Sequence, residues 1–393
     1  MVKLFDLIPS IGTFGDVLNL QNSPHNFTVK EVDNMALICY KRDEFDTDCE
    51  YAHMLRGLII DKDTLEIICY GLNKGNNYES FKETHAFSDL VIEESIDGTM
   101  LNLFYYGDSW RVSTRTMVNA AESKFYSKRS FLDLFMDAKM DYDLETLDKG
   151  YTYTFVLNHP ENRIVTKYDK SELVHVNTRD MSNLELVDVN IDIKRPIVYK
   201  DMKSYEELDA CLETLIYKNE GFMLYSQSDR GVRSKVKGKA YSEVKELRGN
   251  HRNNLYRILE LRKENDKKQY ANYFKYYPEY KQDDYFLSSE IKNLINDILD
   301  TYNKVKKDKV FIEIPNHLKT PIFELHNFWK DLMTKWTKKK EAAKQLDNDE
   351  QLELKKPSIN YRGVHIYFLK LPVYKQYYLL KRNLEYKLIS DVQ

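Results

Sequence analysis

Short apolar runs with alternating or β-branched residues dominate the first 250 positions of the chain, and turn residues separate them. This pattern predicts β-strands with much antiparallel pairing. Two stretches, 123–138 and 204–218, instead carry apolar residues at helical spacing. The predicted strands are ALICY, LRGLIIDK, EIICYGL, LVIEESI, LNLFYY, WRVSTRT, YTYTFVL, NRIVTKY, LVHVNT, GFMLYS and RSKVKG. Strands mixed with a few helices in this way favour an α+β fold.

From about residue 243 the pattern changes. Apolar residues recur every three or four positions in 288–307 and 324–346, which predicts long helices. We therefore expect a sheet-rich domain over residues 1–245 and a mainly helical domain over residues 246–393.

The composition is that of a globular protein without a membrane segment. Hydrophobic residues make up 42% of the 393 positions, which suffices for packed cores. No apolar stretch approaches the ~20 residues of a membrane helix, and the first residues lack the pattern of a secretory signal. The four cysteines, Cys39, Cys49, Cys69 and Cys211, lack CxxC spacing, so neither a zinc site nor a disulfide framework is indicated. A cytoplasmic protein without a membrane partner is expected.

The net charge of −3 conceals an asymmetry. Residues 251–393 hold 28 Lys/Arg and 20 Asp/Glu, a balance of +8, which leaves −11 for residues 1–250. A basic segment beside an acidic one suggests that the basic part meets a polyanion, although a solvated helical surface explains it equally well. The charged stretch 338–356 is expected to be an exposed helix end and a mobile loop that ends at Pro357.

Tyrosines are concentrated in the basic segment. Residues 251–393 hold 14 of the 30 tyrosines, interleaved with lysines. Aromatic side chains among basic groups can stack on unpaired bases while lysines neutralise phosphates. For any particular residue the favoured interpretation is a helical bundle with a Tyr-rich core and a lysine surface.

The octapeptide at residues 92–99, IEESIDGT, is the most informative motif. Taken alone, its Asp97-Gly98 pair most often forms a hairpin turn, here between VIEESI and TMLNLFYY. The octapeptide also resembles the Lys-x-Asp-Gly signature of nucleotidyltransferases, with Ser95 in place of the nucleophilic lysine.

Further short motifs follow one another in a characteristic order. Each alone is usually a solvated strand edge or a turn, so only the joint order carries weight. The series is Arg56-Gly57, Asn73-Lys74, Ser95-Ile96-Asp97-Gly98, Arg115, Phe155-Val156, Glu161-Asn162-Arg163-Ile164-Val165, Glu220-Gly221-Phe222 and Lys235-Val236-Lys237. Over roughly residues 50–245 this order and spacing resemble the ATP-dependent RNA ligases of the bacteriophage tRNA-repair type, within the covalent nucleotidyltransferase superfamily.

The resemblance implies an α+β nucleotidyltransferase domain with antiparallel sheets, followed by a mainly helical C-terminal domain. It implies ATP and Mg²⁺ as cofactors and RNA, including broken tRNA, as the partner of what we expect to be a monomer. Nucleotide-binding roles fall on Arg56, Lys74, Asp97, Gly98 and Arg115. Arginine suits bidentate phosphate binding because its donors form a fixed fork.

The resemblance also implies roles for Glu220, which binds the nucleotide, and for Lys235 and Lys237, which are catalytic. Glu220 matches a carboxylate that binds the nucleotide and is a candidate Mg²⁺ ligand, because hard cations prefer oxygen donors. Lys235 and Lys237 match a Lys-x-Lys motif. Residues two apart on a strand share one face, so both ammonium groups could reach the α-phosphate and its leaving group.

Three departures from the family pattern fall in the nucleotide pocket. Ser95 replaces the nucleophile, and a serine hydroxyl is hard to deprotonate without an adjacent base. Val156 stands where a glutamate is expected, and Gly75-Asn76 where the family has aromatics.

These departures leave three functions open. The first is an RNA ligase scaffold that joins 3′-hydroxyl and 5′-phosphate ends through adenylated intermediates but is defective in autoadenylation. The second is a non-catalytic nucleotide- or RNA-binding pseudoligase, natural or engineered. The third is an α+β structural protein of a large virus or phage. A viral protein would act in the host cytoplasm.

Overall fold

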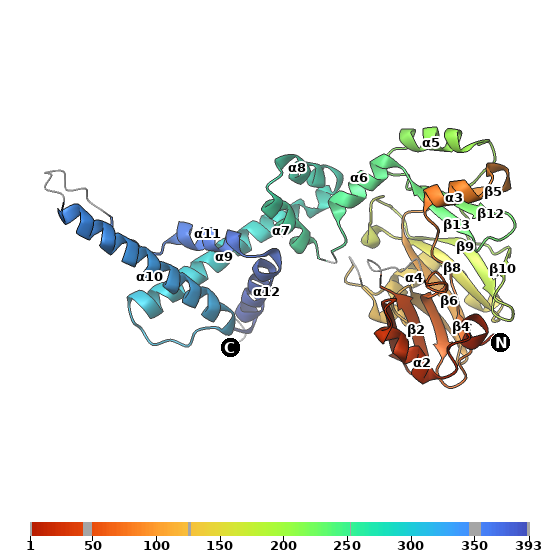
Figure 1. The fold of residues 1–393 in the computed structure, drawn as a ribbon, viewed down its shortest axis with the longest axis horizontal. Coiled ribbons are helices and arrows are strands. Elements are labelled where there is room, and N and C mark those ends of the chain that lie inside the picture. The colour runs from red at the N-terminus through yellow and green to blue at the C-terminus, as the bar shows by residue number, and fades with distance from the viewer. Residues whose placement is uncertain (1, 42–48, 125–126, 252, 346–354, 391–393) are drawn as a thin grey trace. The chain divides into compact units, whose positions relative to one another are not determined.

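The computed structural model describes residues 2–41, 49–124, 127–251, 253–345 and 355–390. The chain divides into two compact units, Met1–Arg248 (unit 1) and Gly249–Gln393 (unit 2). The expected boundary after residue 245 lies inside α6 (Lys239–Arg248), which unit 1 contains to its end. Figure 1 shows the elements of both units. Within the described ranges, no helix is long and apolar enough to cross a membrane.

The first sheet of unit 1 is antiparallel, with strand order β1-β2-β3-β4. Its central strands are almost wholly buried because both faces are covered. Leu4 of α1 and Val17 of α2 pack on one face, and Phe104 of the second sheet packs on the other. The elements are α1 (Leu4–Leu7), α2 (Phe14–Asn19), β1 (Phe27–Val32), β2 (Met35–Tyr40), β3 (Arg56–Asp61) and β4 (Ile67–Cys69).

The second sheet is also antiparallel, with order β10-β9-β8-β6-β7, and α4 packs on one of its faces. Ser130 starts α4 through a capping box with Asp133, so the helix begins later than the predicted 123–138. The elements are β6 (Thr99–Tyr106), β7 (Ser109–Thr114), α4 (Phe131–Lys139), β8 (Tyr151–Asn158), β9 (Glu172–Asp180) and β10 (Leu186–Val187).

The third sheet, with order β11-β5-β12-β13, carries the first four residues of the octapeptide and the Lys-x-Lys motif. One face packs against α3 and α5 through Phe81, Leu208 and Phe222. Alternation along the strands places Ser95, Lys235 and Lys237 on the opposite face. The elements are α3 (Tyr78–Thr84), β5 (Leu90–Ser95), β11 (Val198–Tyr199), α5 (Tyr205–Thr214), β12 (Gly221–Ser226) and β13 (Arg233–Lys237).

Two local predictions were wrong. Asp97-Gly98 is not a hairpin turn, because β5 pairs with β11 and β12 whereas β6 pairs with β7 and β8. The pair instead connects two sheets. The segment NRIVTKY is not a strand, because the amides of Val165 and Thr166 donate to the Asp97 carboxylate rather than to a neighbouring strand.

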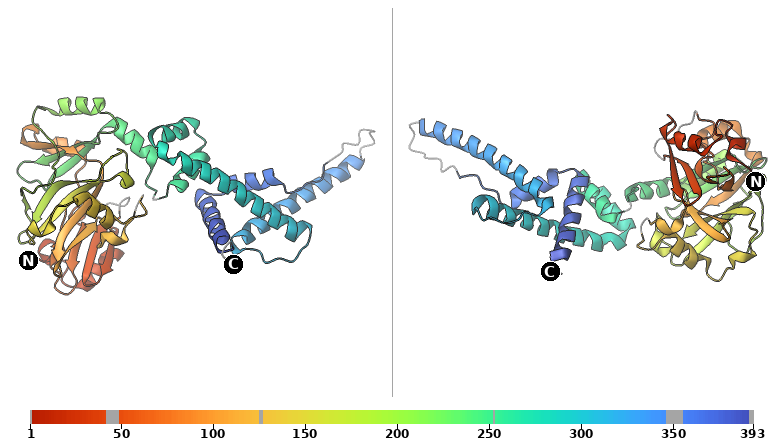
Figure 2. Two further views of the ribbon diagram at one scale, coloured as in Figure 1. Left: turned by 180° about the vertical axis from the view of Figure 1, so that it is seen from behind. Right: turned by 90° about the horizontal axis from the view of Figure 1, so that it is seen from below.

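In the part of unit 2 that the structure describes, all regular structure is helical, as the pattern from residue 243 predicts. Its longest buried stripe lies on α9, which contacts α7, α10, α11 and α12 (Figure 2). The helices are α7 (Asn254–Glu264), α8 (Lys267–Tyr276), α9 (Lys281–Tyr302), α10 (Asn316–Gln345), α11 (Tyr361–Lys370) and α12 (Val373–Ser390). The predicted loop within 338–356 falls mostly on positions 346–354, which lie outside the described residues. The expected α+β architecture, with antiparallel sheets followed by a helical region, is confirmed.

Candidate active site

Three strands of the third sheet meet at the centre of the candidate site. Ser95 of β5 lies opposite Gly221 of β12, and Gly221 lies opposite Lys237 of β13. Gly221 has a φ of +139°, and a Cβ at this position would lie 2.2 Å from the Val236 carbonyl oxygen. Only glycine tolerates this approach. The tight pairing holds the preceding residue, Glu220, at the end of β13.

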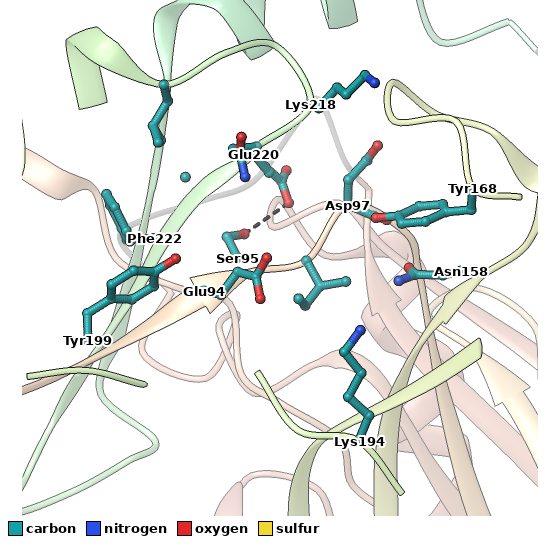
Figure 3. Close-up of a pocket in the computed structure, with 14 residues that line it drawn as sticks. Glu94, Ser95, Asp97, Asn158, Tyr168, Lys194, Tyr199, Lys218, Glu220 and Phe222 are labelled. Carbon is teal, nitrogen blue, oxygen red and sulfur yellow. Dashed lines mark hydrogen bonds between the residues drawn. The ribbon is translucent and has the colours of Figure 1, made fainter. Parts of the chain in front are cut away.

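Glu220 is the hub of the site and is 3% exposed. Its Oε2 accepts a hydrogen bond from Ser95 Oγ at 2.9 Å (Figure 3) and contacts Lys235 Nζ at 2.5 Å. Lys237 Nζ and Lys245 Nζ each lie 4.0 Å from Oε1. Burial opposes ionisation, but the three ammonium groups outweigh it and hold the pKa of Glu220 below its ordinary value. Glu220 is therefore a carboxylate at neutral pH, neutralised by lysines.

Lys235 responds to the same surroundings. Desolvation lowers the pKa of its ammonium group, although the carboxylate of Glu220 acts in the opposite direction. Ser95 and Lys235 bond one carboxylate oxygen, so they lie on the same side of the sheet.

Asp97 ties three segments together and is 4% exposed. Its Oδ2 accepts from the amides of Val165 and Thr166 at 3.0 and 2.7 Å, and its Oδ1 accepts from the Tyr241 hydroxyl at 2.7 Å. Asp97 thus holds the loop after β8 and the helix α6 against the octapeptide. With its carboxylate engaged in this way, Asp97 acts here as a structural anchor.

Gly98 is required for a close approach within the protein. A Cβ at this position would lie 2.6 Å from the Leu157 carbonyl oxygen and 2.6 Å from Val156 Cγ1. The glycine therefore lets the connection between the two sheets lie directly on β8.

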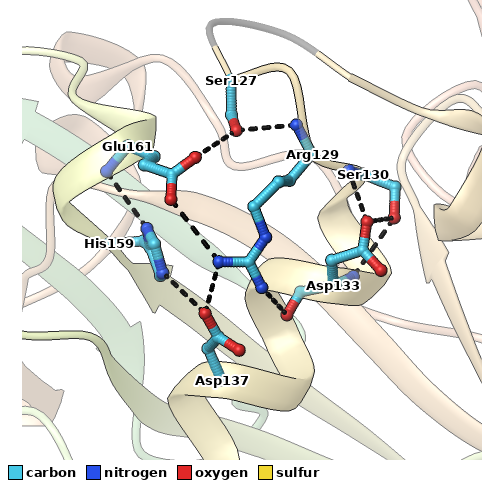
Figure 4. A network of polar contacts seen from close by, with 7 residues as sticks. All are labelled: Ser127, Arg129, Ser130, Asp133, Asp137, His159 and Glu161. Carbon is cyan, nitrogen blue, oxygen red and sulfur yellow. Dashed lines mark hydrogen bonds and ion pairs between the residues drawn. The ribbon is translucent and has the colours of Figure 1, made fainter.

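A network of polar contacts anchors the start of the same loop (Figure 4). Glu161 accepts from Ser127 Oγ at 2.7 Å and from Arg129 Nη1 at 3.4 Å, and its amide donates to His159 Nδ1 at 3.1 Å. Arg129 also pairs with Asp137 at 2.5 Å, which lowers the pKa of the Asp137 carboxyl. The segment ENRIV is thus fixed at Glu161 by this network and at Val165 by Asp97.

Ser95 and Glu220 open onto a polar pocket of about 90 Å³ (Figure 3). Glu94, Lys194 and Lys218 also line it. Lys194 pairs with Glu172 at 2.7 Å. A pocket of this size and polarity beside Ser95 has room for a side chain longer than serine.

A second group of cations gathers around Arg56. Its Nη1 donates to the Leu72 carbonyl oxygen at 3.3 Å and contacts Met100 Sδ at 3.2 Å. Desolvation, followed by the repulsion of Arg233, lowers the pKa of Arg56 to about 10. Desolvation also lowers the pKa of Lys74, and Arg56 adds to this effect. Cations that repel one another in a desolvated position form a suitable site for an anion such as a phosphate.

Arg115 belongs to the same group. It follows the end of β7, and its guanidinium lies 5.5 Å from the centre of the Tyr40 ring. Its repulsion also contributes to the lowered pKa of Arg56. Strand β13 connects this group with Glu220 and its lysine partners, because Arg233 lies on the same strand face as Lys235 and Lys237.

The two other departures also lie at this site. Val156 is 7% exposed and pairs with Met100, the residue that Arg56 contacts. The segment Gly75-Asn76 runs along β13: the Asn76 amide donates to the Arg233 carbonyl oxygen at 2.7 Å, and Ser234 Oγ donates to the Asn76 carbonyl oxygen at 3.0 Å. These hydrogen bonds hold the segment to β13.

Sequence reasoning missed Tyr241 and Lys245. Both lie on α6, four residues apart and therefore on one face of the helix. Their only signal in the sequence is this spacing just after Lys235-Val236-Lys237. No group of three or more His, Cys, Asp or Glu in the described ranges could hold a metal ion. Because Glu220 is engaged by lysines, its role as a Mg²⁺ ligand stays a prediction.

Comparison with known proteins gives distant similarities. No protein-family model matches the chain. The chain is 25% identical over 286 residues to an immediate-early protein ICP-46 homolog of Invertebrate iridescent virus 3, covering 68% of this chain and 62% of that protein. It is 24% identical over 232 residues to a putative bifunctional polynucleotide kinase/RNA ligase of Autographa californica nuclear polyhedrosis virus, covering 53% and 33%. The chain thus spans less than two thirds of either relative.

Among solved structures, an archaeal ATP-dependent RNA ligase is similar with a TM-score of 0.44 and 15% identity. The match covers 66% of this chain and 68% of that one.

Proposed function

We propose that unit 1 is a nucleotidyltransferase domain of the ATP-dependent RNA ligase type. The observation that carries the proposal is the convergence of Ser95 Oγ and Lys235 Nζ on one carboxylate oxygen of Glu220, which brings three separate motifs together. The order of the motifs supports it, as does the similarity to the putative polynucleotide kinase/RNA ligase of Autographa californica nuclear polyhedrosis virus. The substrates would be RNA 3′-hydroxyl and 5′-phosphate ends, joined through adenylated intermediates.

The residues of the site have distinct tasks in this reaction. Arg56, Lys74 and Arg115 bind nucleotide phosphates, and Lys235 and Lys237 stabilise charge on the attacked phosphate. In the resembled ligases a lysine amine attacks the α-phosphate of ATP, a P–N bond forms and pyrophosphate leaves. Ser95 has no amine, and its hydroxyl donates to a carboxylate whose lowered pKa makes it a weak base. With serine at position 95, the chain therefore does not form the enzyme–AMP intermediate.

The proposal is tested with α-labelled ATP and purified full-length protein. We expect no stable label on the wild-type chain and a labelled protein for Ser95→Lys, because the pocket beside Ser95 can hold the longer side chain. Ser95→Arg is the matched control, since it adds the charge and bulk without a nucleophilic amine. If Ser95→Lys is not labelled, Val156→Glu is added to it. Labelling of the double variant would then locate a second defect at position 156. A folded double variant that remains unlabelled would refute the proposal.

The sealing step has a separate test. Joining a pre-adenylated RNA end needs no new lysine–AMP bond, so we expect weak sealing of that substrate by the wild-type chain. No sealing is expected from ATP and a 5′-phosphate end. Lys235→Ala or Lys237→Ala should abolish the remaining activity.

A non-catalytic nucleotide- or RNA-binding protein is the second candidate. It is favoured by the ion pairs of Glu220 with Lys235, Lys237 and Lys245, which engage the carboxylate within the protein at a site that has no lysine at position 95. If the chain seals neither substrate but binds RNA with an affinity that falls steeply with salt, this second function holds.

Finer features of the proposal follow from the resemblance. They are Mg²⁺ as the metal, broken tRNA as the substrate, a monomeric state and action in the cytoplasm of a host cell. The viral relatives support the last of these.

A further inference from the structure

Unit 2 contains a pocket of about 360 Å³ between α7, α9, α11 and α12. This volume lies in the lower part of the range of about 300–1,000 Å³ that is usual for small-ligand sites. Its floor is apolar: Leu259 and Phe368 are 2% and 0% exposed, and Ile291 is also buried. The floor therefore offers a dry surface to a hydrophobic or aromatic group.

One wall of the pocket is aromatic. Tyr361 and His365 lie four residues apart on α11, with ring centres 6.2 Å apart. Residues at this spacing share a helix face. Tyr361 is 40% exposed, so its ring is accessible at the rim. An exposed aromatic ring above an apolar floor can stack on a planar group.

The rim of the pocket is cationic. Arg262, Lys263 and Lys292 line it, and no Asp or Glu is among its lining residues. Arg262 is held by Asp284 at 2.6 Å. Lys263 donates to the carbonyl oxygens at the end of α11, the shortest at 2.6 Å to Leu371.

Lys292 differs from Arg262 and Lys263 in its polar contacts. It is exposed and makes no hydrogen bond or ion pair with any residue that the structure describes. Its ammonium group, beside a fixed guanidinium, is thus available to a ligand anion. One available cation and its neighbours suit the single charge of a phosphodiester, which also matches the excess of basic residues in 251–393.

We propose that this pocket accepts one unpaired nucleotide of an RNA strand, with the base against Tyr361 and His365 and its phosphate at Lys292. The choice of RNA rests on the proposed function. The binding itself needs no adenylyl transfer, so the two proposals fail separately. A base that must stack inside the pocket has to be unpaired, and discrimination against duplex RNA follows.

The test is fluorescence anisotropy of a short labelled single-stranded RNA with the full-length protein. Tyr361→Ala should weaken binding by about 5- to 150-fold, the usual effect of losing one base–aromatic stack. Lys292→Glu should weaken binding and reduce the dependence of log affinity on log salt by about one ion. The matched controls are Tyr374→Ala, another exposed tyrosine, and Lys335→Glu, an exposed lysine on α10. Neither control should change the affinity.

A second arm shows whether the base enters the pocket. A series of RNAs, each with an abasic site at a different position, is bound to the wild-type protein and to Tyr361→Ala. At one position the abasic site should weaken binding to the wild-type protein but not to Tyr361→Ala. The proposal would be overturned if duplex RNA bound as tightly as single-stranded RNA, or if the effects of the abasic site and of Tyr361→Ala on binding were additive at every position. It would also be overturned if free AMP displaced the RNA at a concentration similar to that of the RNA itself.

Discussion

Replacement of Glu220 by Gln is the perturbation that most directly tests the electrostatic design of the site. The change keeps the shape of the side chain and removes the charge that three lysines share. Lys235 lies 2.5 Å from the carboxylate, and Lys237 and Lys245 lie 4.0 Å from it. Glu220→Gln therefore removes one negative charge that lies beside three ammonium groups.

The size of the effect follows from burial. Removal of one partner from a buried ion pair costs about 3–5 kcal/mol. The side chain of Glu220 is 2% exposed, but those of its lysine partners are 29–36% exposed, so water can solvate the ammonium groups that remain. We therefore expect the free energy of unfolding to fall by about 1–3 kcal/mol.

The assay is urea unfolding with a reporter confined to unit 1. The three tryptophans are Trp110, Trp329 and Trp336, and only Trp110 lies in unit 1. Phenylalanine at the two other positions makes Trp110 fluorescence report unit 1 within the full chain. Glu145→Gln is the matched control, because Glu145 forms an exposed pair with Lys149 and should contribute less than about 1 kcal/mol.

The dependence on pH provides a second readout. The pKa of Glu220 is lowered in the folded state, so its contribution is complete above the unfolded-state pKa of about 4.3. That contribution is lost as the pH falls through the folded-state pKa. The difference between wild type and Glu220→Gln should be constant from pH 8 to about 5 and shrink below that. A loss no larger than that of Glu145→Gln, or a difference independent of pH in acid, would refute the reasoning.

Two further changes are expected to alter stability. Tyr241→Phe removes the hydrogen bond to buried Asp97 and should cost about 1.5–3 kcal/mol in the same urea assay, whereas Tyr199→Phe should cost little. Burial, followed by the charge of Arg195, lowers the pKa of His175 to about 4, so its contribution is present above about pH 6.5 and lost as the pH falls towards 4. His175→Gln should remove up to about 3 kcal/mol of this acid dependence, and an unchanged profile would contradict it.

The periodicity of the sequence predicted the structure correctly where contacts between neighbouring residues determine it. The alternation in RSKVKG places Lys235 and Lys237 on one strand face, and both are the exposed residues of β13. The helical spacing of 204–218 identified α5, although the helix ends at Thr214. These features depend on contacts within a few residues, which a sequence pattern encodes directly.

The wrong predictions concern segments whose hydrogen-bonding partners lie far away in the sequence. The hairpin expected at Asp97-Gly98 did not form because β5 pairs with residues more than 100 positions away in β11 and β12. The strand expected at NRIVTKY did not form because the Asp97 carboxylate takes the amides of Val165 and Thr166. Lys245 joins Glu220 only because α6 turns it towards β12. No periodicity within a single segment contains these relations.

The same cluster determines how a lysine at position 95 would behave. Ser95 already bonds the carboxylate oxygen that Lys235 holds, so Ser95→Lys would bring a fourth ammonium group to Glu220. One carboxylate cannot neutralise four cations, and both burial and like charge lower the pKa of an amine. An amine with a lowered pKa is the form that attacks phosphorus. Labelling of Ser95→Lys by α-labelled ATP should therefore rise with pH and reach half its maximum well below the ordinary lysine pKa of about 10.4. Glu220→Gln in the same background removes the counter-charge at Glu220 and should lower that midpoint further, while reducing the protein's stability. A midpoint at or above 10.4, or one that Glu220→Gln raises, would show that the lysine cluster does not activate an amine at this position.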